Sequence, residues 1–359
     1  MRKHYLDNLR YGIVLLVVFY HIIYIFNSVG VITNVSIPGV PQMDIFLYII
    51  YPWFMPCLFL ISGISTRYAL EKQTGKQFLK KRAKTLLIPS IAGIFLIGWF
   101  SGFVTNHYND MFAGNGDIIP GVIKYFIYCF AGIGPLWYIH QLFIAYLVLI
   151  LIRKIDKKDK LYALGSKTNL IVLVLLVVAV WISSMLFNTP LIEVYRHGIY
   201  VFMFLLGYYI FSHEHIINLV EKYKYLFLGI GIITGIFFTL YFWGENYSLM
   251  KNLQHPITNA FAWFMSLALL GCTKTWFDKE YHFTKYMRKR SFAFYVLHYF
   301  VLMLFTYLID LYFDVPPMAF YFILMILMTV MLPITYEIVS RIPIIRSLLL
   351  GIYNEKKVK

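Results

Sequence analysis

The sequence predicts an all-α protein, a polytopic bundle of about ten transmembrane helices. Of its 359 residues, 60% are hydrophobic and the mean hydropathy is +0.70, whereas soluble globular domains are about 45–50% apolar. Apolar segments recur along the chain at lengths that suit a hydrocarbon core about 30 Å thick. We expect one transmembrane domain at residues 1–340 and a short basic cytoplasmic tail at residues 341–359.

The first apolar segment follows basic residues but lacks a clear small-residue cleavage site, so we interpret it as a span and not as a secretory signal. Prolines inside the second segment are compatible with a membrane helix when neighbours satisfy the freed carbonyls. Residues 121–132 are apolar but short, so we expect an interfacial or re-entrant piece; a full crossing there would change the count. The expected spans are residues 13–26, 45–64, 86–104, 134–152, 169–187, 198–212, 226–243, 256–272, 292–309 and 318–339.

The distribution of basic residues supports ten spans with both termini in the cytoplasm. If the N-terminus is inside, the cytoplasmic segments hold 29 of the 32 Lys and Arg, and only Lys124, Arg196 and Lys251 lie outside. Cytoplasmic loops of membrane proteins carry such an excess. We therefore expect a multi-pass protein of the cell membrane.

The charge, the cysteines and the histidine spacing do not indicate a nucleic-acid interface, a disulfide framework or a metal site. A net charge of +15 could suggest nucleic-acid binding, but that requires basic residues clustered on a soluble domain, so we expect no nucleic-acid partner. The three cysteines have no paired spacing that would indicate a disulfide framework or a zinc site. His213 and His215 are two residues apart and would point away from each other on a helix, so we expect no metal there.

Arg10 and His21 are the leading catalytic candidates. A step of eleven residues turns an α-helix through about 1100°, so the two share a face and lie roughly 16 Å apart along the axis. His21 would then lie about half-way across the bilayer, where an ionisable side chain is costly unless it faces a polar cavity. A helix-packing histidine is the alternative, but a neutral imidazole is also well suited to accept a proton near neutral pH.

A basic run at the cytoplasmic side of the third span is the candidate for binding an anionic ligand. Topology and anionic lipid explain most such runs, but clustered Lys and Arg could also hold phosphate groups by charge-assisted hydrogen bonds. The residues that we expect to bind are Lys80, Lys81, Arg82 and Lys84.

Four further residues are candidates for substrate binding. Trp137 and His140 lie near the outer end of the fourth span, where Trp also fits an interfacial aromatic belt. Tyr295 and His298 lie one turn apart, about a third of the way in from the cytoplasm, and would serve either as a structural hydrogen-bonding pair or as a cavity lining.

Taken together, these residues resemble the acyltransferase-3 family of integral membrane acyltransferases. The N-terminal signature is carried by Leu6, Asp7, Asn8, Leu9 and Arg10, with His21 following after ten residues. Supporting matches are Phe59-Leu60-Ile61-Ser62-Gly63, the basic run at residues 80–89, Leu136-Trp137-Tyr138, Phe204-Leu205-Leu206-Gly207 and Tyr295-Val296-Leu297-His298.

The resemblance implies an enzyme that moves an acyl group, usually acetyl, from cytoplasmic acyl-coenzyme A to a hydroxyl of an extracytoplasmic glycan or glycolipid. The family's essential Arg and His map onto Arg10 and His21, and its coenzyme-binding motif maps onto residues 80–84. Here the motif is rich in Lys, which binds phosphate without the bidentate fork of Arg. Acyl-coenzyme A would be a donor substrate, and we expect no permanently bound cofactor.

Two other classes remain compatible with the residues. A transporter or flippase of a glycan or lipid would also use ten helices and a few buried polar groups, but it has no need of a cytoplasmic phosphate site. A sensor or scaffold would turn over no thioester.

Overall fold

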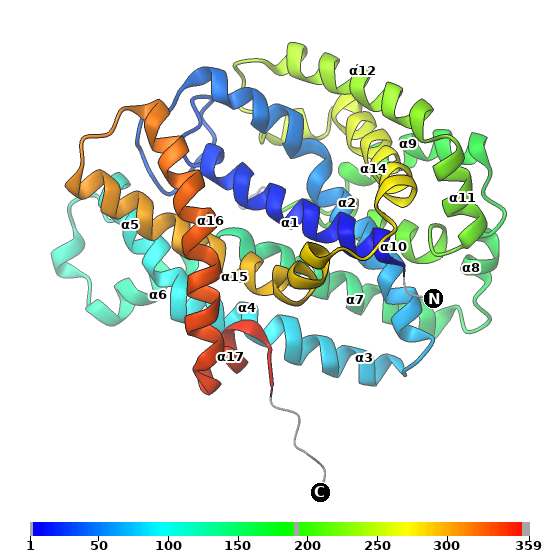
Figure 1. Cartoon of the computed structure of the whole chain (residues 1–359), viewed down its shortest axis with the longest axis horizontal. Coiled ribbons are helices and arrows are strands. Elements are labelled where there is room, and N and C mark those ends of the chain that lie inside the picture. Colours follow the sequence, from blue (N-terminus) through cyan, green and yellow to red (C-terminus); the bar gives the residue numbers. More distant parts are fainter. Residues whose placement is uncertain (1–2, 190–193, 354–359) are drawn as a thin grey trace, which may run out of the picture. The chain divides into compact units, whose positions relative to one another are not determined.

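The computed structural model describes residues 3–189 and 194–353, and no β-strand forms in these ranges. The all-α prediction is confirmed. Figure 1 shows the helices coloured along the sequence, with labels where there is room. The last six residues of the expected basic tail lie outside the described residues; the part before them carries a short helix, α17.

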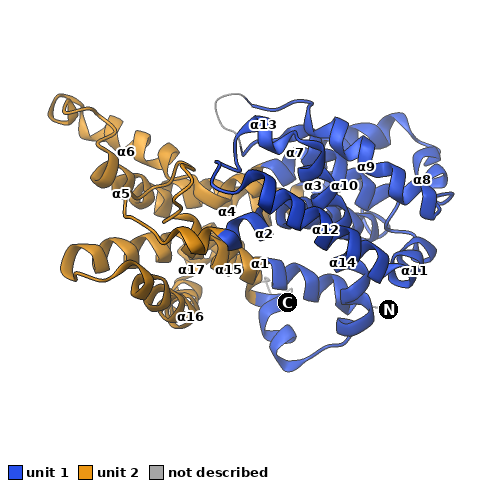
Figure 2. Ribbon diagram, turned by 90° about the horizontal axis from the view of Figure 1, so that it is seen from above, with its two compact units in different colours: residues 1–13, 45–79, 141–289 blue, residues 14–44, 80–140, 290–359 orange. Residues whose placement is uncertain are grey.

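The chain divides into two helical units, which Figure 2 colours separately. The first unit is built from residues 1–13, 45–79 and 141–289. Its complete helices are α2 (Ile45–Leu70), α8 (Lys160–Gly165), α9 (Leu170–Ser184), α10 (His197–Tyr209), α11 (Glu214–Lys222), α12 (Lys224–Phe242), α13 (Met250–Leu253) and α14 (Pro256–Phe277).

The second unit is built from residues 14–44, 80–140 and 290–359. Its complete helices are α4 (Ile88–Gly93), α5 (Trp99–Asn109), α6 (Gly121–Ala131), α16 (Pro317–Arg341) and α17 (Pro343–Leu350). Four helices contribute residues to both units: α1 (His4–Tyr24), α3 (Gly75–Arg82), α7 (Trp137–Ile155) and α15 (His282–Tyr312).

Glycines allow a close helix contact in the first unit, between α2 and α10. A Cβ added at Gly63 would overlap the carbonyl oxygen of Phe204, and one added at Gly207 would overlap the carbonyl oxygen of Leu60. Small residues let membrane helices approach closely enough for backbone packing. The reciprocal pair therefore fixes where these two helices cross.

The second unit uses the same device between α5 and α6. A Cβ at Gly102 would overlap the carbonyl oxygen of Tyr128 on α6. The segment at residues 121–132, expected to be interfacial or re-entrant, forms the 11-residue helix α6 (Gly121–Ala131), with Gly132 as its C-cap. At about 1.5 Å per residue, this helix is shorter than a bilayer core is thick.

Within residues 3–189 and 194–353, eight helical segments are long and apolar enough to cross a membrane. They cover eight of the ten expected spans within the described residues. The other two expected spans correspond to α9 and α10, which have 15 and 13 residues. The polytopic helical fold is confirmed, and the number ten stays a prediction.

Several helices expose large apolar side chains, as expected for a protein surrounded by lipid. Ile171 on α9 is 68% exposed, Leu240 on α12 is 72% exposed and Ile326 on α16 is 66% exposed. Water would disfavour such surfaces by about 25 cal/mol per Å². These faces fit contact with hydrocarbon.

Candidate active site

His21 lies near the C-terminal end of α1, in the second unit, and is half-buried. Its Nδ1 lies 2.7 Å from the carbonyl oxygen of Val17, one turn earlier on the same helix. Aromatic rings surround the imidazole: the centroids of Tyr20, Tyr24 and Tyr299 lie 5.3, 5.7 and 5.3 Å from its own. The side chain is thus held in one orientation by a local hydrogen bond and three rings.

His298 on α15 is the polar partner of His21. Its Nε2 lies 3.4 Å from Nδ1 of His21, and the two ring centroids are 5.1 Å apart. Its Nδ1 lies 2.7 Å from the carbonyl oxygen of Tyr295, and the residue is fully buried. The structure therefore joins two residues that the sequence proposed separately, one as a base and one as a substrate-binding residue.

Tyr295 lies one turn before His298 and packs beside it, with ring centroids 5.7 Å apart. Its hydroxyl donates a hydrogen bond to the carbonyl oxygen of Pro135, and its ring lies 5.6 Å from that of Tyr138. Tyr295 thus links the histidine pair to the segment that begins α7.

A chain of hydrogen-bonded side chains, which the sequence did not predict, lies beside the histidine pair. The hydroxyl of Tyr299 donates to Oδ1 of Asn34, and Nδ2 of Asn34 donates to Oγ1 of Thr105 at 2.5 Å. Tyr299 directly follows His298, and this adjacency could have indicated Tyr299 as a site residue. Asn34 lies in a loop 265 residues away from Tyr299, and no sequence pattern indicates that pairing.

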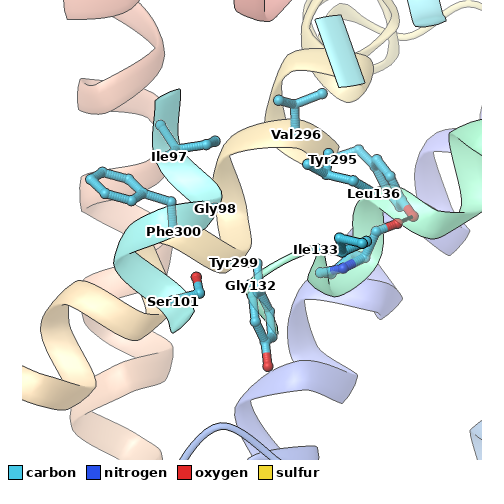
Figure 3. Close-up of a pocket in the computed structure, with 11 residues that line it drawn as sticks. Ile97, Gly98, Ser101, Gly132, Ile133, Leu136, Tyr295, Val296, Tyr299 and Phe300 are labelled. Atoms are coloured by element: carbon cyan, nitrogen blue, oxygen red, sulfur yellow. Dashed lines mark hydrogen bonds between the residues drawn. The ribbon is translucent and has the colours of Figure 1, made fainter. Parts of the chain in front are cut away.

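A small cavity lies beside Tyr295 and Tyr299 (Figure 3). Its volume is about 10 Å³, which is room for roughly one water-sized group. The hydroxyls of Tyr295 and Tyr299 donate to Pro135 and Asn34. The other lining side chain with a hydroxyl is Ser101. The lining residues are Ile97, Gly98, Ser101, Gly132, Ile133, Pro135, Leu136, Tyr295, Val296, Tyr299 and Phe300.

Trp137 and His140, the other predicted substrate-binding residues, lie in the first turn of α7 and are half-buried. They follow Pro135, which accepts the Tyr295 hydrogen bond. His298 contacts His21, and Tyr295 contacts His298. The substrate-binding role of Trp137 and His140 stays a prediction.

Arg10 lies eleven residues before His21 on the same uninterrupted helix, as the spacing predicted. It belongs to the first unit, where its Nη2 donates a hydrogen bond of 2.6 Å to Oγ of Ser65. Its Nη1 lies 3.8 Å from Oδ1 of Asp7. The guanidinium is therefore oriented by α2 and by the turn before it, with its charge incompletely neutralised by one weak ion pair.

The predicted phosphate-binding residues lie where α3 ends and a π-helical turn begins, in the second unit. Lys80, Lys81 and Lys84 are exposed and Arg82 is half-buried. The ammonium of Lys84 lies 4.0 Å from the ring centroid of Tyr353, whose hydroxyl donates to the carbonyl of Lys84. Three accessible ammonium groups within five residues can bind a polyanion.

The structure assigns local roles to His213 and His215. Nε2 of His213 lies 3.0 Å from the carbonyl oxygen of Tyr162, and Nε2 of His215 lies 2.8 Å from that of Ser166. The pKa of His213 lies below its ordinary value because burial disfavours its charged form. Within the described ranges, no three His, Cys, Asp or Glu side chains gather as a metal site.

The chain matches the family model described as an acyltransferase domain over residues 3–336. No curated protein and no solved structure matches the chain significantly. The matched range spans both helical units and contains His21, His298, Arg10 and the basic run. The chain therefore belongs to the acyltransferase-3 family and is a membrane acyltransferase.

Proposed function

We propose that this enzyme transfers an acyl group, most simply acetyl, from cytoplasmic acyl-coenzyme A to a hydroxyl of an extracytoplasmic glycan or glycolipid. The observation that carries the proposal is the contact between His21 and His298 among apolar helices. Burying polar groups in a membrane protein is costly unless they pair or serve a function. An imidazole can accept and return a proton near neutral pH. In an acyltransferase, we therefore assign proton transfer to this histidine pair.

The donor would bind through its phosphates at the basic run. Coenzyme A carries a pyrophosphate and a ribose phosphate, and exposed ammonium groups bind such oxygens as charge-assisted hydrogen bonds. Lys80, Lys81 and Lys84 are exposed, and so are available to a soluble anion. Arg10, whose guanidinium is oriented by Ser65 within the first unit, is proposed to serve the same reaction from its place in the family signature alone.

His21 would act as the general base for the acceptor. The imidazole takes the proton of the acceptor hydroxyl while the oxygen attacks the thioester carbonyl carbon. The carbon–sulfur bond then breaks, the ester forms, and the proton passes from His21 to the leaving thiolate to give free coenzyme A. General-base catalysis of this kind contributes about 10²–10⁴-fold in rate.

The acceptor and the acyl group would meet near the aromatic residues of the second unit. Trp137 and His140 would contact the acceptor, because sugar faces pack on aromatic rings and sugar hydroxyls hydrogen-bond to imidazole. Tyr295 would line the donor side, with His298 beside it as the partner of His21.

The first test follows radioactive acetyl from acetyl-coenzyme A in membranes that contain the wild type, His21→Ala or His282→Ala. His282 is exposed at the start of α15 and serves as a matched control. We expect label in the glycan or lipid fraction with the wild type and with His282→Ala, and a loss of about 10²-fold or more with His21→Ala.

Transfer that persists in the His21→Ala variant would contradict the proposed base. Absence of transfer and of coenzyme A binding in the wild type would contradict the proposed donor. Label recovered solely as free acetate would contradict the proposed acceptor class.

A further inference from the structure

The hydrogen bonds of the histidine pair determine which ring nitrogens carry protons. A carbonyl oxygen can accept a hydrogen bond but has no proton to donate. Nδ1 of His21 lies 2.7 Å from the carbonyl oxygen of Val17, and Nδ1 of His298 lies 2.7 Å from that of Tyr295. Both contacts therefore require a protonated Nδ1.

The two Nε2 atoms then have different roles. A neutral imidazole with a protonated Nδ1 has a lone pair on Nε2. Nε2 of His298 lies 3.4 Å from Nδ1 of His21. The Nδ1–H group of His21 therefore donates a bifurcated hydrogen bond, the shorter branch to the carbonyl oxygen of Val17 and the longer branch to Nε2 of His298. Nε2 of His21 is left as the atom with a lone pair for chemistry.

We propose that His298 is a positioning residue, which holds His21 in the tautomer whose Nε2 is the base. This inference rests on the proposed function, in which His21 accepts the proton of the acceptor hydroxyl. It assigns to a neutral, buried imidazole the role that a carboxylate has in catalytic triads, where the partner fixes the tautomer and stabilises the imidazolium.

The neighbouring hydroxyl groups support this assignment. The hydroxyl of Tyr295 donates to Pro135, that of Tyr299 donates to Asn34 and that of Tyr24 donates to the carbonyl oxygen of Ile32. These three phenols pack around the two imidazoles but direct their protons elsewhere. Nε2 of His298, in contrast, lies 3.4 Å from Nδ1 of His21.

The proton balance of the step follows from this arrangement. When the acceptor hydroxyl gives its proton to Nε2 of His21, the ring becomes an imidazolium with both nitrogens protonated. The lone pair of His298 Nε2 and the carbonyl of Val17 then share the Nδ1 proton and stabilise the charge. The Nε2 proton leaves with the thiolate, and His21 returns to its starting tautomer.

The test compares His298→Gln with His298→Asn. The glutamine amide reaches about as far as Nε2 of histidine and can offer an oxygen to Nδ1 of His21. The asparagine amide ends about where Nδ1 lies, so it keeps a donor for the carbonyl of Tyr295 and leaves His21 without its partner. A structural role centred on the Tyr295 bond predicts that Asn substitutes better, and a positioning role predicts that Gln does.

The readouts are kcat and KM for acetyl-coenzyme A in acetyl transfer. We expect His298→Asn to lower kcat about 10- to 100-fold with little change in KM, because hydrogen bonds to charged groups are worth that much in rate. His298→Gln should keep more than a tenth of the wild-type kcat. In a His21→Ala background, His298→Asn should cause no further loss, since residues acting as a unit are non-additive.

Folding is checked by the recovery and thermal unfolding of each variant in detergent. If His298→Asn does not fold, His298→Gln decides alone: a folded Gln variant with kcat below a tenth of wild type overturns the inference. Equal kcat in the Asn variant and wild type overturns it too, as does a further loss in the His21→Ala background. Those outcomes leave wild-type transfer intact, whereas a wild type without transfer overturns the proposed function and this inference together.

Discussion

At the scale of single residues, the polar groups around His21 in the second unit have defined hydrogen-bond acceptors. The phenols of Tyr295 and Tyr299 and the Nδ1 atoms of both histidines have defined acceptors. The sequence predicted His21, Tyr295 and His298, because ionisable or polar groups stand out inside apolar spans. It could not predict their mutual contact, since His21 and His298 are separated by 277 residues and meet through tertiary packing alone.

The basic run gives a residue-scale prediction. Replacing Lys80, Lys81 and Lys84 together with Gln should raise KM for acetyl-coenzyme A about 3- to 150-fold, because each exposed ion pair is worth about 0.2–1 kcal/mol. The value of kcat should change little, and the effect should shrink as salt concentration rises.

The matched control for that variant replaces Lys154, Lys157 and Lys158, which are equally exposed on a different basic segment. Initial rates against acetyl-coenzyme A concentration measure both variants. An equal rise of KM in the control would mean that the effect is general surface charge, and an unchanged KM in the first variant would remove the basic run from the donor site.

At the scale of elements, hydrophobic periodicity and segment length predicted the helices well but their ends poorly. The second expected span was residues 45–64. Helix α2 includes Pro52 and Pro56 without a break and continues beyond residue 64 to Leu70. The basic segment after it contains a helix of its own, α3. Both differences arise because helix ends depend on tertiary neighbours, which hydropathy does not report.

The α2–α10 crossing gives an element-scale prediction. Gly207→Ala should lower the free energy of unfolding by about 1–3 kcal/mol, since the added Cβ would overlap the carbonyl of Leu60 and force the helices apart. Thermal unfolding in detergent measures the change.

Gly229→Ala is the control, because nothing lies within 4 Å of a Cβ at that position of α12. It should be neutral or slightly stabilising, as alanine favours a helix over glycine by about 1 kcal/mol. Equal stability of the two variants would show that the backbones of α2 and α10 do not meet at Gly207.

At the scale of the whole molecule, composition was enough to predict a helical membrane protein, and the fold agrees. The family required the combination of spaced motifs, because each motif alone is common. The membrane orientation remains a prediction that rests on basic residues: 29 of 32 Lys and Arg fall on the side that we assign to the cytoplasm. It predicts that the donor is used from that side alone.

Sealed membrane vesicles test this account most directly, because acetyl-coenzyme A does not cross a bilayer unaided. Vesicles of both orientations, made from cells that produce the wild type or His21→Ala, are supplied with labelled acetyl-coenzyme A outside. We predict label in enclosed glycan or lipid solely in inside-out vesicles with the wild type. Equal labelling in right-side-out vesicles, or in inside-out vesicles with His21→Ala, would contradict transfer across the membrane through His21.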